Sequence, residues 1–174
     1  MCWYKPFLQP LAKRFIAGEQ AQDAILHARR LKQRHITPLF DVLGEHAQGK
    51  TGALRTSTDY MNLLDILHDH HVKGGISLKL TAFGLDEDEE TCLRAVSRVV
   101  RHAHALGFVV WIDMEFSPYT TATLRVYKAL LEKYENVGIC IQAYLKRAKR
   151  DILSLVPNKP KIRLVKGVYP EPSQ

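Results

Sequence analysis

Hydrophobic and polar positions follow a repeated order along this chain: a short apolar run, then a longer segment with apolar residues at helical spacing. The short apolar runs lie at residues 36–43, 76–80, 108–112, 137–143 and 161–168. Strands that are apolar on both faces are typical of a parallel sheet that helices cover. The pattern therefore predicts an α/β fold built from βα units, with about five strands.

The segments outside these runs predict helices. Residues 13–33 form the first, and a second begins at Asp59 after a polar loop at 45–57, with Ser57 or Thr58 as its cap. The clearest helix begins in the acidic run 86–90 and ends at Gly107, because acidic residues favour the first turn and glycine the end. A further helix follows Ser117–Pro118, and another occupies about 146–155.

Polar residues stand near the carboxyl ends of four successive predicted strands. They are Lys79, Asp113, Gln142, and Arg163 or Lys166. An open sheet serves its ligand mainly from the strands beside the point where the order reverses, whereas a barrel brings all strand ends to one axis. We therefore expect an incomplete (βα)₈ TIM-type barrel, with a helical segment at 1–35 and strands one to five at 36–174.

The last strand carries two cations in an otherwise apolar run. Arg163 and Lys166 are three residues apart, so strict alternation sends them to opposite faces unless the turn at Gly167 redirects Lys166. One interpretation is a core strand whose long cations reach the surface. The other is a site for an anionic ligand at the carboxyl end of a parallel strand.

Composition narrows the class of protein. The 174 residues carry a formal net charge of +7, which indicates an acidic partner, but the densest basic run, 146–150, lacks the aromatics and glycines of RNA-binding segments. We expect no nucleic-acid role. No apolar run is long enough to span a membrane, and the cysteines at 2, 92 and 140 form no CxxC pair. Reduced thiols and a cytoplasmic location are the prediction.

A histidine cluster ends the second predicted helix. Residues His68, His70 and His71 lie too close in sequence to present the i, i+4 face of a zinc helix. A solvated helix end, whose dipole favours positive charge, explains them better than a metal site. We expect no metal.

Six ordered motifs resemble one enzyme family. They are RFIAGE (14–19), DVLGEH (41–46), SLKLTAFG (77–84), IDMEFSPYTTATL (112–124), IQAYLKRAKRDI (141–152) and RLVKGVYPEP (163–172). In this order they are similar to proline dehydrogenase of the monofunctional bacterial type. The resemblance implies a distorted (βα)₈ barrel that uses FAD to oxidise L-proline to 1-pyrroline-5-carboxylate and passes the electrons to a quinone.

The resemblance also implies roles for residues around the flavin. Arg163 matches the arginine beside the flavin N5, where a guanidinium stabilises developing charge. Gln142 and Lys166 match residues that bond the isoalloxazine, and Tyr169 matches a tyrosine near the flavin. Without the family, Gln142 is equally explained as a partner for a buried backbone group and Tyr169 as a core residue.

Two further matches concern the substrate. Lys79 matches the lysine that faces the proline carboxylate, and Asp113 matches an aspartate that orients the substrate pocket. A helix cap is the structural alternative for Asp113. Asp41 and Glu45 lie in a family motif, but the resemblance gives them no chemical step.

The family continues for three more strands and a helix whose arginine pair clamps the substrate carboxylate. We therefore expect a C-terminally truncated chain, inactive alone, and a second chain that completes the barrel is one alternative. A peripheral contact with the inner membrane stays open, since the electron acceptor is a quinone. Two other functions stay open as well: a Schiff-base aldolase using Lys166 or Lys79, and a non-catalytic half-barrel that acts only as an assembly partner.

Overall fold

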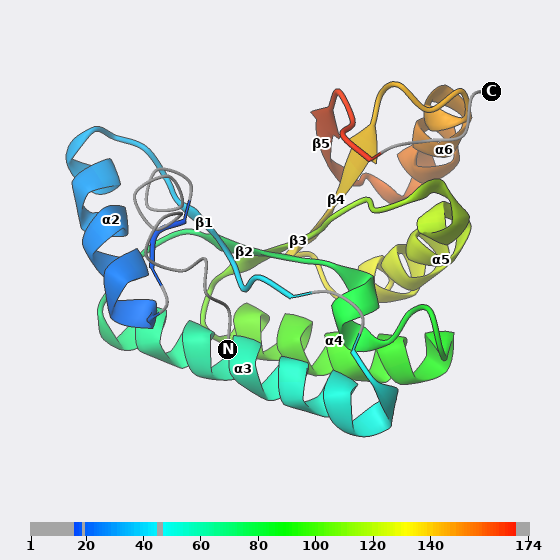
Figure 1. The fold of residues 1–174 in the computed structure, drawn as a ribbon. Coiled ribbons are helices and arrows are strands. Elements are labelled where there is room, and N and C mark those ends of the chain that lie inside the picture. Colours follow the sequence, from blue (N-terminus) through cyan, green and yellow to red (C-terminus); the bar gives the residue numbers. More distant parts are fainter. Residues whose placement is uncertain (1–15, 19, 45–46, 170–174) are drawn as a thin grey trace, which may run out of the picture.

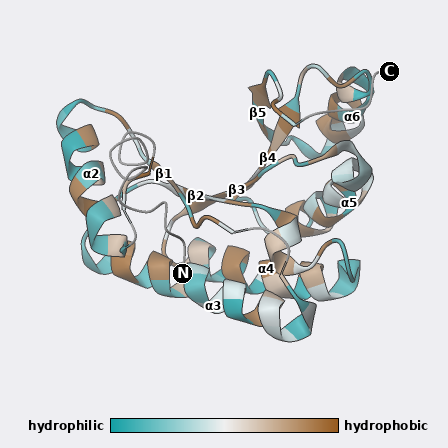
Figure 2. Ribbon diagram, viewed as in Figure 1, coloured by the Kyte–Doolittle hydropathy of each residue, from teal (hydrophilic) through white to brown (hydrophobic). Residues whose placement is uncertain are grey.

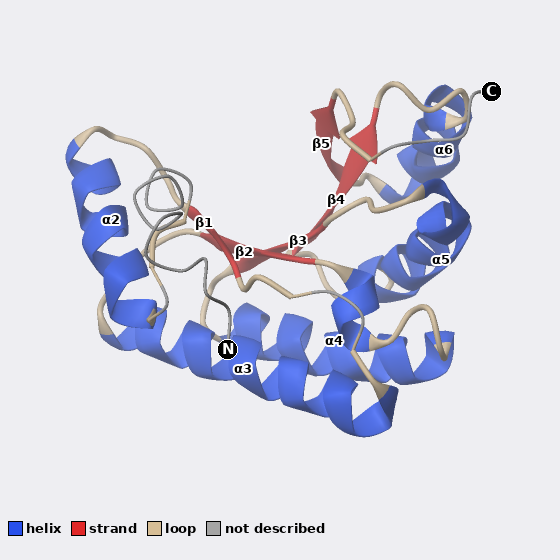
Figure 3. Cartoon of the chain, in the orientation of Figure 1, coloured by secondary structure: helices blue, strands red, loops and turns tan. Residues whose placement is uncertain are grey.

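Five parallel strands form the centre of the protein. The computed structural model describes residues 16–18, 20–44 and 47–169. The strands are β1 Leu39–Asp41, β2 Gly75–Leu78, β3 Val109–Ile112, β4 Val137–Gln142 and β5 Lys161–Val165, paired in the order β1-β2-β3-β4-β5 (Figures 1 and 3). An order without reversal is that of one arc of a (βα)₈ barrel. The predicted α/β fold with an incomplete barrel is confirmed.

Helices connect successive strands. They are α2 Ala21–Gln33, α3 Gly49–Asp69, α4 Glu89–Ala105, α5 Thr120–Leu131 and α6 Ala148–Leu155, with short 3₁₀ turns η1 Leu80–Phe83, η2 Ser117–Tyr119 and η3 Val156–Asn158. Figure 1 shows α3, α4, α5 and α6 following the outer side of the curved sheet, while α2 stands at the β1 end. The helices therefore leave the inner side of the strands to the site.

The core lies between the sheet and these helices. Ile76 and Leu78 of β2, and Val110 and Ile112 of β3, are fully buried on the outer face. Hydrophobic residues gather on the strands and on the helix surfaces against them (Figure 2). Burying each such side chain contributes about 1.5–3 kcal/mol, so this layer fixes the frame on which the strand ends are held.

The inner face of the sheet is shaped by one aromatic ring. Trp111 on β3 stands beside Gly138 on β4, its partner in register. A Cβ at Gly138 would lie 2.6 Å from the ring of Trp111, so only glycine leaves room for the indole. The guanidinium carbon of Arg163 lies 5.8 Å from the centroid of the same ring. The glycine and the indole thus support the arginine of β5.

Two predicted helix starts differ from the structure. Helix α3 begins at Gly49, so the predicted helix start at Asp59 is wrong and residues 49–57 of the predicted loop are helical. Ser57 caps nothing: it is buried and donates to the carbonyls of Ala53 and Ala95, each at 3.0 Å. Packing of α3 against α4 overrides the poor helix propensity of Gly49 and its polar neighbours. Helix α2 begins at residue 21; the predicted start at residue 13 lies outside the described residues, and 16–18 are not helical.

Helix α4 follows the prediction closely. Asp88 accepts hydrogen bonds from the backbone N–H groups of Glu90 and Thr91, at 3.3 and 3.1 Å, and Gly107 follows the helix end with a φ of 76°. Cys92 and Cys140 are free, buried thiols as expected, whereas Cys2 lies outside the described residues. Among the described residues, none of the helices has the length and hydropathy of a membrane span.

Candidate active site

Charged side chains from four strands converge at the carboxyl edge of the sheet. Asp41 ends β1, Lys79 follows β2, Asp113 follows β3, and Arg163 lies within β5. Each is linked to another by an ion pair. We call these four residues, together with Ser77 of β2, the carboxyl-edge cluster.

Asp113 is the centre of the carboxyl-edge cluster. Its Oδ1 accepts a hydrogen bond from Ser77 Oγ at 2.7 Å and pairs with Arg163 Nη2, which also lies 3.5 Å from Ser77 Oγ. The backbone N–H of Asp113 donates to the carbonyl of Leu78 at 2.9 Å, so β2 fixes the aspartate at its main chain as well. Since Asp113 is bonded across strands, the alternative role as a helix cap does not describe it.

Lys79 lies between two carboxylates. Its Nζ is 2.9 Å from Asp41 Oδ2 and 4.0 Å from Asp113 Oδ2, and the side chain is 16% exposed. Burial acts to lower the pKa of Lys79, but the hydrogen bond to Asp41 and the charges of Asp41 and Asp113 outweigh it and raise the pKa above its ordinary value. Lys79 is therefore a cation at neutral pH. This counts against an imine-forming role, which needs a lysine with a lowered pKa.

The orientation of Asp41 depends on a buried tyrosine. The hydroxyl of Tyr60, on α3, lies 2.8 Å from the carbonyl oxygen of Ser77 and 3.2 Å from Asp41 Oδ1, and it accepts from Val42 N–H at 3.4 Å. Burial, followed by the charge of Asp41, raises the pKa of Tyr60. The neutral hydroxyl thus ties the end of β1 to β2 and orients the partner of Lys79.

A second polar group, centred on the buried Glu115, links the strand ends to one another. Glu115 is 2% exposed and accepts from Thr81 N–H at 3.1 Å and from Thr81 Oγ1 at 2.5 Å. Gln142, at the end of β4, donates from Nε2 to the carbonyl of Glu115 at 2.8 Å and accepts from Val168 N–H at 3.3 Å. These bonds link the carboxyl ends of β2, β3, β4 and β5.

Arg163 has a buried donor that the described part of the protein leaves without a partner. Its Nη2 pairs with Asp113, its guanidinium lies over Trp111, and the side chain is 33% exposed. The Nε is buried and has no hydrogen-bond partner among the described residues. A buried guanidinium donor without a partner is costly, and a ligand acceptor at the site would remove the cost.

Lys166 and Tyr169 follow β5. Lys166 is exposed, and Gly167 adopts a φ of 109° next to it. The ring of Tyr169 packs against Phe116 at 4.4 Å between centroids, and its carbonyl accepts from the hydroxyl of Tyr144 at 2.8 Å. The structure therefore brings Lys79, Asp113 and Arg163 together and leaves Lys166 outside them.

Three residues of the site were absent from the sequence interpretation: Ser77, Tyr60 and Trp111. Ser77 stands two positions before Lys79, so period-two alternation places both on one face and was a usable signal. Tyr60 gives no such signal, because its helix was expected to begin only at Asp59. Glu45, named in the sequence motif, lies outside the described residues.

Comparison with known proteins gives one consistent result. Residues 24–172 match the family model described as proline dehydrogenase. The chain is 34% identical over 160 residues to proline dehydrogenase 1 of Bacillus subtilis (strain 168), covering 92% of this chain and 53% of that protein. It is 32% identical over 168 residues to proline dehydrogenase of Deinococcus radiodurans, covering 94% and 54%.

A solved structure agrees with these matches. The crystal structure of proline utilization A (PutA) from Bdellovibrio bacteriovorus, inactivated by N-propargylglycine, superposes with a TM-score of 0.83 at 26% identity. It covers 94% of this chain and 21% of that one. The chain thus spans about half the length of the curated relatives it matches.

Proposed function

Because the chain belongs to the proline dehydrogenase family, we propose that it supplies the flavin-edge and substrate-carboxylate residues of an FAD-dependent proline dehydrogenase. In the proposed reaction L-proline loses two electrons and two protons and becomes 1-pyrroline-5-carboxylate, and the electrons pass to a quinone. The observation that carries this proposal is the convergence of Lys79, Asp113 and Arg163 at the carboxyl edge of the sheet, where barrels place their chemistry.

The residues present fit an isoalloxazine ring. Arg163 offers the unpartnered Nε donor, and flavin nitrogens and oxygens are acceptors. Asp113 and Trp111 hold the guanidinium in place from two sides, so it is preorganised toward developing negative charge. When bound, FAD supplies the acceptor for the hydride that leaves proline. Arg163 would hold the reactive edge of the ring, and Tyr169 would lie near it.

Lys79 is proposed to bind the carboxylate of proline. A lysine ammonium has three N–H donors, and the hydrogen bond to Asp41 uses one, so two remain for the substrate. The pairs with Asp41 and Asp113 restrict the side chain, so less rotamer entropy is lost when substrate binds. Asp113 lies between Lys79 and Arg163 and would keep the lysine that binds the substrate and the arginine that binds the flavin at a fixed separation.

Gln142 and Lys166 are placed differently from the residues that would hold the flavin. Both polar ends of the Gln142 amide already have backbone partners, and the ammonium of Lys166 lies outside the carboxyl-edge cluster. We propose that Gln142 acts by setting the spacing of the strand ends. For the cell, we propose a cytoplasmic protein with a peripheral membrane contact where the quinone is reached.

Reconstitution tests the function directly. The chain is co-expressed with the C-terminal half of Bacillus subtilis proline dehydrogenase 1, so that a second chain completes the barrel, and proline-dependent dye reduction is assayed with added FAD. We expect activity in the mixture and none in either half. A flavin-free, inactive mixture in which the two halves nevertheless co-purify would favour the non-catalytic assembly partner instead.

The role of Lys79 is then tested in the active mixture. Lys79→Ala is expected to raise the KM for proline at least tenfold, the loss of one charged hydrogen bond, while FAD content is retained. Lys133→Ala, at an exposed lysine in the turn after α5, serves as the control. Loss of FAD with unchanged affinity for proline would move Lys79 to the cofactor.

A further inference from the structure

A second concentration of charge lies at the opposite end of the sheet. A cavity of about 400 Å³ opens between the end of α2, the segment before β1 and the segment between α3 and β2. Among the described residues, six basic side chains and no carboxylate line it: Arg29, Lys32, His35, His70, His71 and Lys73. We call these six residues the amino-end basic pocket, because they precede the strands whose carboxyl ends hold the carboxyl-edge cluster.

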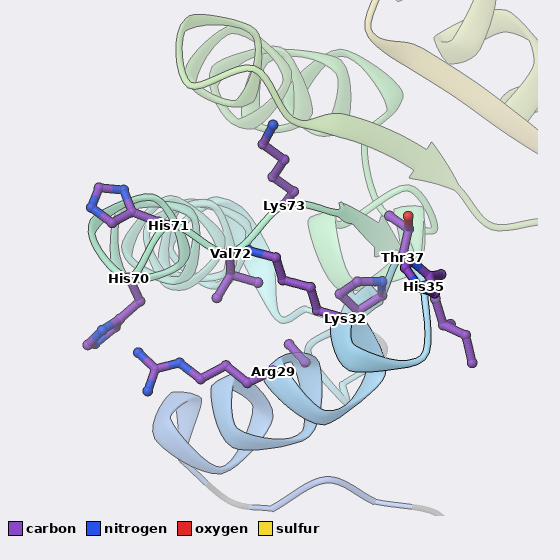
Figure 4. A pocket seen from close by; sticks show the side chains of 11 residues that line it. Arg29, Lys32, His35, Thr37, His70, His71, Val72 and Lys73 are labelled. Carbon is purple, nitrogen blue, oxygen red and sulfur yellow. The ribbon is translucent and has the colours of Figure 1, made fainter.

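The basic side chains of this pocket are not neutralised by the protein. None of the six forms an ion pair within the part of the chain that the structure describes, and the adjacent Asp69 pairs with none of them. Figure 4 shows Arg29 and His70 pointing toward one another and Lys32 reaching from α2 toward Val72, while Lys73 points away. Side chains of α2 and of the α3 end thus meet at the cavity.

Helix dipoles do not account for this charge. Helices α2 and α3 both end at the pocket, and each C-terminus is equivalent to about half a negative elementary charge. Together they offset about one of the three permanent cations, Arg29, Lys32 and Lys73. The histidines add further positive charge when protonated. A net positive charge remains at the pocket, and it attracts an anion.

The backbone gives an independent observation. His35 and His71 follow the two helix ends with φ values of 58° and 53°, in the left-handed region. Glycine usually occupies this position because it avoids a cost of about 1–2 kcal/mol. Both residues line the cavity, so each of the two helix ends brings a histidine to it.

We propose that the amino-end basic pocket binds a small molecule that carries a diphosphate group. A diphosphate carries about three negative charges, and its oxygens accept from the ammonium, guanidinium and imidazole donors that line the pocket. Ile36 and Val72 add apolar surface for an organic group attached to the phosphates. The volume lies within the range of small-molecule sites. The site is separate from the proposed catalytic edge, and the inference does not depend on that activity.

Titration calorimetry of the 174-residue chain with inorganic pyrophosphate, at fixed ionic strength, tests the proposal. Arg29→Glu/Lys32→Glu changes two exposed pocket residues, and Lys149→Glu/Arg150→Glu makes the same charge change on α6, at the other end of the molecule (Figure 1). We expect the pocket variant to weaken binding at least tenfold and the α6 variant to weaken it less than twofold. Equal weakening in both variants would show attraction to net charge only and overturn the proposal, as would absence of binding to the unaltered chain.

A second titration with adenosine diphosphate examines the organic group. If Ile36 and Val72 contribute, adenosine diphosphate binds more tightly than pyrophosphate to the unaltered chain, and Val72→Asp removes the difference. Binding of pyrophosphate that is tighter than that of the nucleotide would overturn the part of the proposal that concerns an organic diphosphate.

Discussion

The two ends of the sheet treat positive charge in opposite ways. At the carboxyl edge, Lys79 and Arg163 each pair with an aspartate that other strands hold in place. At the amino end, Arg29 and Lys32 have no anionic partner among the described residues. Paired charges are fixed before any ligand arrives, which suits a site where a reaction needs precise geometry. Cations without a protein partner remain available to a ligand, and their side chains stay free to move. Such an arrangement suits a site that binds an anion without reacting with it.

This difference predicts unequal responses to substitution. Removing one member of the carboxyl-edge network leaves a buried partner unsatisfied, so stability falls. Removing a cation from the amino-end basic pocket relieves repulsion, so stability is unchanged or rises. The predictions below begin with the largest effect.

Glu115→Ala should cause the largest loss. It leaves the N–H and the hydroxyl of Thr81 without an acceptor in a buried position, and we expect the free energy of unfolding to fall by about 3 kcal/mol. Urea unfolding followed by circular dichroism measures it. Glu132→Ala, at an exposed residue, is the control and should change stability by less than about 0.5 kcal/mol. Equal values for the two variants would contradict the bracing role of Glu115.

Tyr60→Phe should lower the free energy of unfolding by about 1 kcal/mol, since the hydroxyl holds the ends of β1 and β2. Tyr127→Phe is a matched control: this tyrosine is also fully buried, but its hydroxyl makes only one long contact, 3.5 Å from the carbonyl of Lys161. Thermal unfolding compares the two variants. A larger loss in Tyr127→Phe would show that burial, and not the link to Asp41, decides the effect.

Arg29→Gln should raise the free energy of unfolding by a few tenths of a kcal/mol at low ionic strength, because it removes one of the three permanent cations that line the amino-end basic pocket. The gain should disappear in 1 M salt, where charges are screened. Denaturant titrations at both salt concentrations measure it. A loss of 1 kcal/mol at low salt would mean that Arg29 has an anionic partner within the protein.

The smallest effect concerns alkaline pH. The pKa of Lys79 is raised in the folded chain, because its pairs with Asp41 and Asp113 outweigh burial. A raised folded pKa stabilises the protein fully below the unfolded value, about 10.4, and this contribution disappears as pH rises through the folded pKa. The unaltered chain should therefore lose stability above about pH 10 more steeply than Lys79→Met. Parallel stability curves of the two proteins from pH 9 to 12 would contradict the raised pKa.

Sequence reasoning succeeded where local pattern controls structure. The short apolar runs placed Lys79 and Asp113 near the carboxyl ends of two neighbouring strands, where the structure has them after β2 and β3. It failed at α3, where glycines and polar residues resembled a loop and only packing against α4 makes them helical.

The site was likewise only partly accessible from sequence. The fold decides which cation lies close enough to pair with which aspartate: Asp113 pairs with Arg163, and Asp41 pairs with Lys79. The amino-end basic pocket joins residues from 29 to 73, and the histidines among them looked like an isolated solvated helix end. No local period links segments that far apart, so the pocket emerges only from the fold.

The central claim is that Arg163 stands at the reactive edge of the flavin. Its most direct test is the stopped-flow rate of flavin reduction by L-proline in the reconstituted protein, with Arg163→Met compared with Arg94→Met, an exposed arginine that also pairs with a carboxylate. The account predicts a rate about 10²- to 10³-fold lower for Arg163→Met, the loss of one preorganised donor, and a change below twofold for Arg94→Met. An unchanged rate in a flavin-loaded Arg163→Met protein would contradict it.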